Sequence, residues 1–168
     1  MIRTQRIYLR ELLPNDSDDY FLISPTTDAI LMKYASFFAT NSPKKAKEFL
    51  TEHYFSNYSR LLGIFSSKND SLIGALLVKQ YYFNKNYLSY LDLSFFISET
   101  YRGNGYITET LKSIIDYYSG KGLFLEYLKF VVDPKNDSCI KVMEKIQCEC
   151  WSDPNLSFGY PLKYRKKL

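Results

Sequence analysis

A short glycine-bearing segment, Arg102-Gly103-Asn104-Gly105, lies between an expected strand and an expected helix. Successive backbone N–H groups at such a turn can converge on a phosphate, and glycine lets the backbone approach the anion. The guanidinium of Arg102 adds a fixed positive charge suited to phosphate oxygens. A Gly-x-Gly turn alone is weak evidence, because an ordinary tight turn explains it equally well. The dinucleotide-binding fingerprint fails, since Thr108 stands where its third glycine would be.

A carboxylate, Asp92, stands within a strand that otherwise has a buried character. Alternation over residues 87–97 places Leu91, Leu93, Phe95 and Ile97 on one face of that strand, and Asp92, Ser94 and Phe96 on the other. An acid in this position either takes part in proton transfer or forms a structural ion pair with an inward arginine, such as Arg10.

Three cysteines, Cys139, Cys148 and Cys150, accompany a single histidine, His53. Zinc sites usually use a second pair of ligands, and His53 is distant from the cysteines in sequence, so we expect no metal. The odd number of cysteines, together with an N-terminal segment that has no apolar core, favours a reducing cytoplasm. His53 lies on the apolar stripe of the helix predicted at 43–58, so we interpret it as a packed residue.

The elements expected around these residues alternate between strands and helices. Strands are predicted at 6–10, 61–65, 72–79, 87–97 and 127–132, with two more near 148–151 and 158–164. Helices are predicted at 16–23, capped by Asp16, at 43–58, capped by Ser42, and after residue 106 and residue 136. This pattern predicts one mixed α/β domain over residues 1–168.

Length and composition exclude several classes of protein. The 168 residues, 46% hydrophobic and 24% charged, are typical of a globular chain, which excludes disorder and coiled coils. No apolar run approaches 18 residues, so we expect no membrane span. The aromatic fraction of 17% is high. So many aromatic side chains require either a core rich in aromatic residues or an aromatic cleft.

The net charge of +4 is concentrated at the C-terminus. Lys163, Arg165, Lys166 and Lys167 are four of the last six residues, and the rest of the chain has equal numbers of basic and acidic residues. We interpret this segment as a solvated basic end. A contact with RNA or the ribosome is the alternative.

The glycine segment, extended as Arg102-Gly-Asn-Gly105-Tyr-Ile107, resembles the Arg/Gln-x-x-Gly-x-Gly/Ala loop of the GNAT superfamily of acyl-CoA-dependent N-acetyltransferases. Residues 4–10 followed by Asp16 are similar to the opening of the subgroup that contains ribosomal-protein N-terminal and spermidine acetyltransferases. Residues 132–146 resemble the fifth strand and fourth helix of that subgroup. The resemblance implies a mostly antiparallel sheet of six to seven strands, a parallel and splayed pair formed by the fourth and fifth strands, and four helices.

The resemblance also implies a place for acetyl-CoA, the expected co-substrate, in the V-shaped gap between the fourth and fifth strands. The implied coenzyme-binding residues are Phe96, Ile97, Ser98, Arg102, Gly103, Asn104, Gly105, Tyr106, Ile107 and Asn136. The backbone of 102–107 would hold the pyrophosphate, and 96–98 and Asn136 would contact the pantetheine arm. A backbone N–H near Phe96 would act as oxyanion donor, worth roughly 3 to 4 kcal/mol.

In such a site the amine attacks the thioester directly, so catalysis consists of positioning and the removal of one proton. Asp92 is the candidate base, acting through a water, and Ser94 on the same strand face is a further candidate catalytic residue. Asp92 also aligns with an acidic residue that often precedes the coenzyme-contacting strand end in this family. Glu99 and Glu109 are weaker alternatives, because the helix dipole alone explains an acid such as Glu109 in a first turn.

The chain departs from the family pattern at the group that would protonate the leaving thiolate. Many relatives have a tyrosine where Met143 stands, and relatives of the ribosomal-protein type have a serine where Cys139 stands. A thiol can donate a proton, with an ordinary pKa of about 8.5, so Cys139 is the candidate acid. A small helix residue packed against the sheet is the alternative. The usual small residue of the loop is replaced by Ile107.

The acceptor pocket is implied to lie among the first two helices, the turn between them and the strands that face them. The candidate acceptor-binding residues are Asp28, Tyr34, Phe37, Tyr81 and Tyr82. Aromatic rings can hold an amine by cation–π contacts worth about 0.5 to 2 kcal/mol each, although packing explains any single tyrosine. The expected acceptor is a primary amine, on a peptide N-terminus or a small molecule.

Two other classes of function stay open. One is a CoA-binding module of the same fold whose catalytic groups have decayed, which the methionine at 143 motivates. The other is a protein that docks on the ribosome or RNA through its basic C-terminus. We expect no membrane and no nucleic-acid partner, and the sequence does not decide between a monomer and a homodimer.

Overall fold

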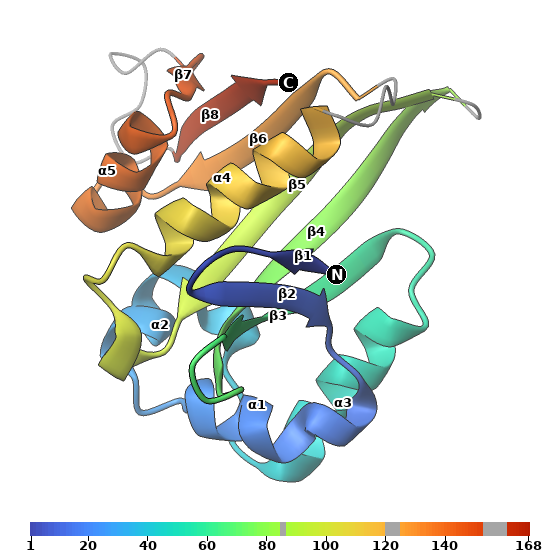
Figure 1. Cartoon of the computed structure of the whole chain (residues 1–168), viewed down its shortest axis with the longest axis vertical. Coiled ribbons are helices and arrows are strands. Elements are labelled where there is room, and N and C mark those ends of the chain that lie inside the picture. The colour runs from blue at the N-terminus through green and yellow to red at the C-terminus, as the bar shows by residue number, and fades with distance from the viewer. Residues whose placement is uncertain (85–86, 120–124, 153–160) are drawn as a thin grey trace.

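The computed structural model describes residues 1–84, 87–119, 125–152 and 161–168, with side-chain surroundings for these residues except 81–84 and 87–89. One eight-stranded sheet runs through the molecule (Figure 1). Across the sheet the strands are β1 (Ile2–Arg3), β2 (Ile7–Glu11), β3 (Ser59–Ser66), β4 (Leu72–Asn84), β5 (Tyr87–Ile97), β6 (Tyr127–Val132), β8 (Leu162–Lys167) and β7 (Glu149–Cys150). The mixed α/β class is confirmed. The short edge strands β1 and β7 bring the number above the six or seven expected.

All neighbouring strands are antiparallel except β5 and β6. Their parallel ladder is short, with Tyr90 opposite Tyr127 and Asp92 opposite Lys129 at its two ends. Beyond Asp92, β5 stays paired with β4 as far as Ile97, while β6 stays paired with β8. The two strands therefore separate, as the family resemblance implies, and leave a gap whose walls are β5 from residue 93 and β6 from residue 130.

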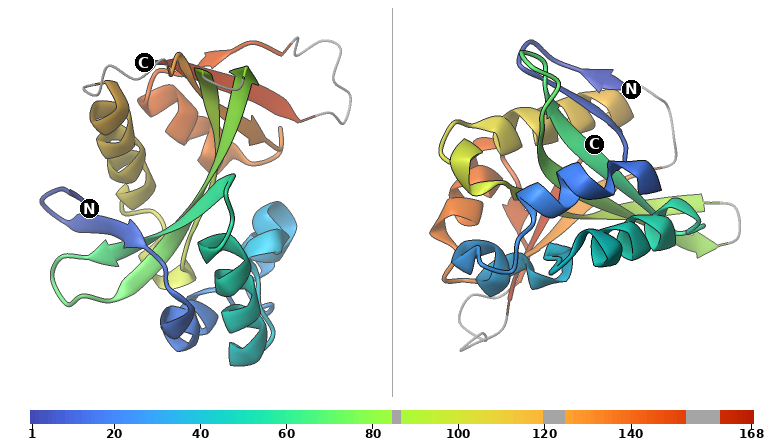
Figure 2. Two further views of the ribbon diagram at one scale, coloured as in Figure 1. Left: turned by 90° about the vertical axis from the view of Figure 1, so that its right-hand side faces the viewer. Right: turned by 90° about the horizontal axis from the view of Figure 1, so that it is seen from below.

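Helices lie on both faces of the sheet (Figure 2). They are α1 (Ser17–Ile23), α2 (Ala29–Ala35), α3 (Pro43–Tyr54), α4 (Tyr106–Ser119) and α5 (Asp137–Lys145), with 3₁₀ turns at Pro14–Asp16, Ser36–Phe38 and Glu99–Tyr101. Four of the helices match the predicted ones. The fifth, α2, was not predicted, and it forms because Asp28 accepts the backbone N–H groups of Ile30 and Leu31 as an N-cap.

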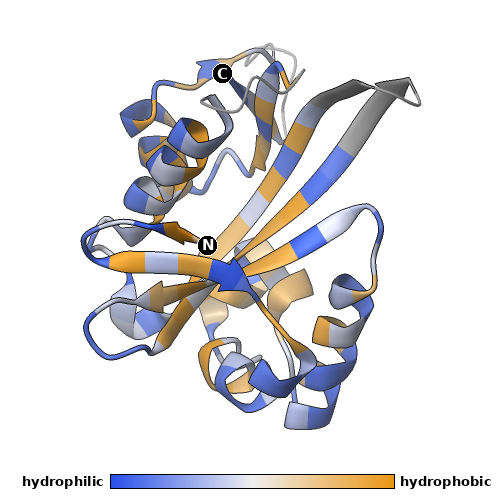
Figure 3. Ribbon diagram, turned by 45° about the vertical axis from the view of Figure 1, so that its right-hand side comes forward, coloured by the Kyte–Doolittle hydropathy of each residue, from blue (hydrophilic) through white to orange (hydrophobic). Residues whose placement is uncertain are grey.

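The alternation of β5 separates two hydrophobic clusters. Leu93 and Ile97 pack with α4 and α5, whereas Phe96 packs with α1, α2 and α3. Figure 3 shows the resulting change between hydrophobic and hydrophilic residues along the strands. Much of the aromatic excess lies in these clusters, including the fully buried Tyr20 and Phe38.

Helix boundaries follow local hydrogen bonding, with one correction to the prediction. Ser42 caps α3, as expected, by accepting the N–H of Lys45 at 3.2 Å. Asp16 does not cap α1, because its carboxylate turns back to accept the N–H of Leu13 at 2.7 Å and pairs with Arg10 at 2.8 Å. None of the helices in the described ranges is long and apolar enough to cross a membrane.

The basic C-terminal residues form β8 and do not form a free end. The strand β8 pairs along the whole of β6, and its Tyr164 is buried in the core. The alternation of the strand places Lys163, Arg165 and Lys167 on one face. The interpretation of this segment as a solvated end is therefore wrong for its backbone, although Lys163 and Lys167 are exposed.

Candidate active site

A cavity of about 560 Å³ occupies the gap between β5 and β6. Its volume falls in the range of roughly 300 to 1,000 Å³ that is usual for small-molecule sites. The lining comes from residues 93–97 of β5, 130–133 at the end of β6, and 101–103 and 105–108 of the glycine loop and α4. It is completed by residues 30, 31, 34, 35 and 37 around α2 and by 135–139, 141, 142 and 145 around α5. The splayed strands thus bring together segments that are far apart in the sequence.

The glycine loop ends where α4 begins, at Tyr106. Both Gly103 and Gly105 have a φ of 78°, a left-handed conformation that side chains other than glycine rarely adopt. A Cβ atom at Gly103 would meet nothing within 4 Å, so the backbone conformation, and not space, requires glycine there. The first N–H groups of α4 have no partner within the helix. They point toward the loop end as an anion-binding terminus would.

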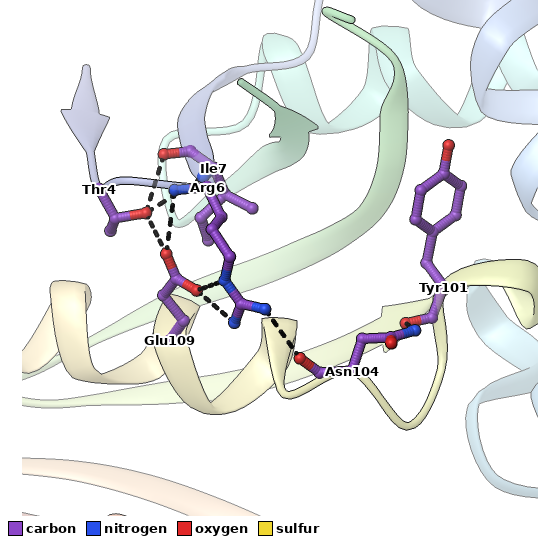
Figure 4. A network of polar contacts seen from close by, with 6 residues as sticks. All are labelled: Thr4, Arg6, Ile7, Tyr101, Asn104 and Glu109. Carbon is purple, nitrogen blue, oxygen red and sulfur yellow. Dashed lines mark hydrogen bonds and ion pairs between the residues drawn. The ribbon is translucent and has the colours of Figure 1, made fainter. Parts of the chain in front are cut away.

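The N-terminal strand turn holds this loop in place through Arg6 (Figure 4). Its guanidinium donates to the carbonyl oxygen of Asn104 at 3.1 Å and to Glu109 at 2.7 Å, and it lies 4.8 Å from the centre of the Tyr106 ring. Glu109 also accepts the hydroxyl of Thr4 at 2.5 Å. Burial pushes the pKa of Glu109 up, but these hydrogen bonds outweigh burial and lower it. Glu109 is thus a structural residue with two partners, beyond the dipole effect expected from sequence.

Arg102 and Asp28, which the sequence analysis assigns to different ligands, form one ion pair. The Arg102 guanidinium also donates to the carbonyl oxygen of Ile97 at 3.1 Å. Asp28 is 6% exposed and caps α2 at the same time. Burial raises the pKa of Asp28, but hydrogen bonds from Arg102 and from two backbone N–H groups lower it overall. The pair joins the glycine loop to the helix that forms the opposite wall of the cavity.

Two further acceptor candidates lie along the α2 wall. The Tyr34 hydroxyl donates to the carbonyl oxygen of Lys135 at 2.9 Å, so α2 reaches across the cavity to the segment after β6. Phe37 is half exposed, and its ring centre lies 4.2 Å from that of Phe38. Both Tyr34 and Phe37 line the cavity. The side chains of Tyr81 and Tyr82 lie outside the described residues, so their predicted role stays a prediction.

The first turn of α5 brings Asn136 and Cys139 to the cavity. The Asn136 side-chain oxygen accepts the Cys139 N–H at 3.1 Å and so caps the helix, which leaves its amide N–H groups as the donors it can offer. Burial raises the pKa of the Cys139 thiol to about 12. Met143, at the position where many relatives have a tyrosine, is fully buried in the core and does not line the cavity.

Phe96 and Ile97 line the cavity, whereas Ser98 does not and donates its N–H to the carbonyl oxygen of Ile73 at 2.9 Å. Asn104 also lies outside the lining, and its side chain bonds the carbonyl oxygens of Tyr101 and Arg102. Ile107 lines the cavity and packs on the core.

Asp92 and Ser94 lie on the face of β5 that is turned toward α1, α2 and α3. Ser94 lines the cavity, and Asp92 stands two residues below it, at the point where the parallel ladder ends. Burial raises the pKa of Asp92, and the nearby Lys129 and Lys79 offset this only in part. The alternative partner, Arg10, is bonded to Asp16. The ion pair between Asp92 and Arg10 is therefore not formed.

Two lysines of α5 that line the cavity were not among the predicted site residues. Lys141 and Lys145 both line the cavity and are exposed, four residues apart on one helix face. Lys135 lines it from the preceding loop. Exposed lysines are common on helices, so the four-residue spacing was the only feature of the sequence from which their place on one cavity-facing side could have been predicted. Among the described residues no group of three metal-ligating side chains occurs.

The chain matches the acetyltransferase (GNAT) domain family over residues 6–149. No match to the sequence was found among curated proteins. Its fold is similar to a Salmonella typhimurium acetyltransferase that modifies the N-terminal serine of a 50S ribosomal subunit protein, with a TM-score of 0.80 and 13% identity over 99% of this chain and 98% of that one.

Two further similar structures contain a coenzyme. A ribosomal alpha-N-protein acetyltransferase in complex with coenzyme A, which is joined to a cysteine by a disulfide, has a TM-score of 0.81 and 14% identity, covering 99% of this chain and 97% of that one. The microcin self-immunity acetyltransferase MccE, in complex with acetyl-CoA and AMP, has a TM-score of 0.82 and 13% identity, covering 98% and 94%. At these identities the likeness concerns the fold.

Proposed function

Because the chain belongs to the GNAT family of acetyltransferases, we propose that it binds acetyl-CoA and transfers the acetyl group to a primary amine within a ternary complex. The observation that carries the proposal is the cavity between the separated β5 and β6, with the N-terminus of α4 at one end. The two coenzyme complexes of similar fold support the choice of acetyl-CoA.

The pyrophosphate would lie on the backbone of 102–107, where the first N–H groups of α4 and the left-handed glycines form an anion site. Lys141 and Lys145 would add charge for the remaining phosphate oxygens. Arg102 contributes by fixing the loop, since its guanidinium is bonded to Asp28 and to Ile97. The pantetheine arm would follow residues 96 and 97 on one side and Asn136 on the other.

In the reaction, the amine nitrogen attacks the carbonyl carbon of the acetyl thioester, and a backbone N–H near Phe96 would stabilise the oxyanion. The carbon–sulfur bond then breaks, the amide forms, and the coenzyme leaves as its thiolate. Asp92 would take the proton of the amine through a water, because it stands on the acceptor-side face of β5 next to the cavity-lining Ser94. Its raised pKa makes the carboxylate a stronger base than an ordinary aspartate.

In this proposal Cys139, which lines the cavity, would contact the leaving sulfur, but its thiol is a poor acid. With a pKa of about 12, it holds its proton more tightly than an ordinary aliphatic thiol with a pKa of about 8.5. A full proton transfer to the coenzyme thiolate is thus uphill. We therefore assign Cys139 the role of a hydrogen-bond donor to the sulfur, with the final proton coming from solvent.

The test is thiol release from acetyl-CoA with a panel of peptides and small amines, run beside calorimetric titration with coenzyme A. We expect coenzyme binding, and turnover with at least one amine above the rate of hydrolysis. Binding without turnover of any acceptor would instead identify a CoA-binding module that lacks catalysis. Absence of coenzyme binding would overturn the proposal as a whole.

A further inference from the structure

A row of charged residues crosses the sheet at the level of Asp92. The strand registers place Lys79 opposite Asp92, Asp92 opposite Lys129, Lys129 opposite Arg165, and Arg165 opposite Glu149. Residues opposite each other on neighbouring strands project from the same face of a sheet. This row therefore projects from the face that carries α1, α2 and α3, which is also the face of Ser94.

The same face continues along β8 and β6, beyond the part that the helices cover. Lys163 and Lys167 flank Arg165 in alternation on β8, and Val131 stands opposite Lys163 on β6. Val131 is 65% exposed and the neighbouring Trp151 is 45% exposed, so this end of the face is open. Figure 2 (left) shows α2 and α3 on this side, below the end formed by β6 and β8, and α4 on the other side. We call these residues of β6 and β8 the open face.

Positive charge dominates the open face and the row that leads to it. The cations are Lys79, Lys129, Lys163, Arg165 and Lys167, and the carboxylates that face them are Asp92 and Glu149. Glu149 is committed to Arg165 at 2.8 Å. The Lys129 ammonium lies 3.3 Å from the centre of the Tyr90 ring, and the Arg165 guanidinium 5.2 Å from that of Tyr127. Lys129 and Arg165 are thus held on the sheet by aromatic rings, and among the described residues that these registers place opposite the five cations, only two are acids.

The open face begins at the cavity itself. Val131 belongs to both, because it lines the cavity and stands opposite Lys163. A chain whose terminal amine reached Ser94 and Asp92 from the acceptor side would leave past Val131 and lie over Lys163 and Arg165. The side chains of alternate residues along β8 are about 7 Å apart, which is also the spacing of alternate side chains in an extended peptide.

We propose that the acceptor is the N-terminal amine of a polypeptide whose following residues are acidic, and that these residues dock on the open face. The inference rests on the proposed function, since it names the substrate class of the same site. A polyamine does not fit here, because its repeated positive charges would be repelled by the five cations of the open face and of the row that leads to it. A nucleic acid would satisfy the charge, but it brings no aliphatic amine to the cavity.

The test compares three peptides with the same two N-terminal residues, followed by glutamate-rich, glutamine-rich or lysine-rich segments. We expect kcat/KM for the acidic peptide to exceed that for the neutral one by about 10-fold at low salt, and the difference to shrink at high salt. The double variant Lys163→Glu/Lys167→Glu should lose this preference without a change in coenzyme affinity.

Lys44→Glu/Lys47→Glu is the matched control, because it makes the same change of charge on exposed lysines of α3 and should keep the preference. Equal rates for acidic and neutral peptides at low salt would overturn the inference and leave the acetyltransferase function standing. If a small amine is acetylated and no peptide is, the inference fails and the proposed function stands; if coenzyme binds and neither peptides nor small amines are acetylated, the proposed function itself fails. A short single-stranded RNA is titrated in parallel, and charge-dependent RNA binding without peptide preference would assign the open face to nucleic acid and overturn the inference.

Discussion

The carboxylate of Asp28 and the guanidinium of Arg102 form an ion pair between residues 74 positions apart in the sequence. The Asp28 side chain is 4% exposed and that of Arg102 is 24% exposed, so the pair is largely shielded from water. Asp28 also caps α2, and Arg102 also bonds the end of β5. One largely shielded contact therefore joins the glycine loop to the α2 wall of the cavity.

Replacement of Asp28 by asparagine is predicted to remove the ion pair with Arg102 while keeping the N-cap of α2. Asparagine caps a helix about as well as aspartate, so Asp28→Asn should keep α2 and lose only the ion pair. The free energy of unfolding should fall by about 2 to 3 kcal/mol, because the Arg102 charge is left without its counter-charge. Urea unfolding measures this loss.

Asp28→Ala is the companion variant, and it should cost about 1 kcal/mol more because the cap is lost as well. Both variants should raise the KM for the acceptor more than the Kd for coenzyme A, since the proposed function puts the acceptor beside the α2 wall. A wild-type unfolding free energy in Asp28→Asn would show that the ion pair does not stabilise the fold.

The glycine loop leads to a second prediction, which contrasts two residues at one position. Gly105 has a φ of 78°, and a Cβ atom there would find its nearest neighbour, Arg6, at 3.8 Å. Alanine therefore meets strain and no clash, at a cost of about 1 to 2 kcal/mol, whereas asparagine tolerates this region better. Gly105→Ala should weaken coenzyme A binding about 10-fold, and Gly105→Asn should weaken it less.

Calorimetric titration of the purified variants with coenzyme A checks this order, and Gly105→Val, with a β-branched side chain in a left-handed conformation, should bind no coenzyme. Equal losses for alanine and asparagine would mean that the loop does not need a positive φ to hold the ligand. Circular dichroism at matched concentration confirms that the fold is retained.

The sequence was sufficient for the parts of the fold that depend on local pattern. Period-two alternation predicted β5 and its two faces, and the Ser42-Pro43 pair predicted the start of α3. It failed at Asp16, which has the residue type of a cap but is held instead by Arg10. A cap and an ion pair use the same carboxylate, and only the tertiary position of Arg10 decides between them.

The candidate site also contains one part that the local sequence pattern predicted and other parts that it did not. The loop of residues 102–105 was found from its glycines, because a left-handed backbone limits the residue type. The partner of Arg102 was not found, since nothing local relates it to Asp28 in a distant segment. The unpredicted helix α2 has the same cause: seven residues carry little periodicity, and its stability depends on the cap and on Leu31 in the core.

Cys139 supports a third prediction. With its pKa raised to about 12, the thiol stays protonated at neutral pH, so it is neither a ready acid nor a nucleophile. We expect Cys139→Ser to keep kcat within a few-fold, because a hydroxyl also donates a hydrogen bond to the sulfur. Cys139→Ala should lose more of kcat, and both should leave the Kd for coenzyme A nearly unchanged.

Steady-state rates and mass spectrometry after alkylation check this assignment together. Iodoacetamide at neutral pH should modify the exposed Cys150 before Cys139, which is half-buried in the cavity lining. Rapid alkylation of Cys139 would contradict its high pKa. Equal rates for the serine and alanine variants would make the residue structural.

Asp92 supports the last prediction, through the pH dependence of the rate. A general base must be deprotonated, so kcat/KM should rise with pH through the pKa of Asp92, which burial holds above the ordinary value of about 3.9. Asp92→Asn should remove this acidic limb and lower kcat by about 100-fold, with coenzyme affinity unchanged because Asp92 does not line the cavity. Ser94→Ala, two residues along the same strand face, is the control and should keep the limb. An Asp92→Asn enzyme with the wild-type rate and pH profile would assign the proton transfer to another group. Asp92 would then have only a structural role, as the carboxylate between Lys79 and Lys129 on the neighbouring strands.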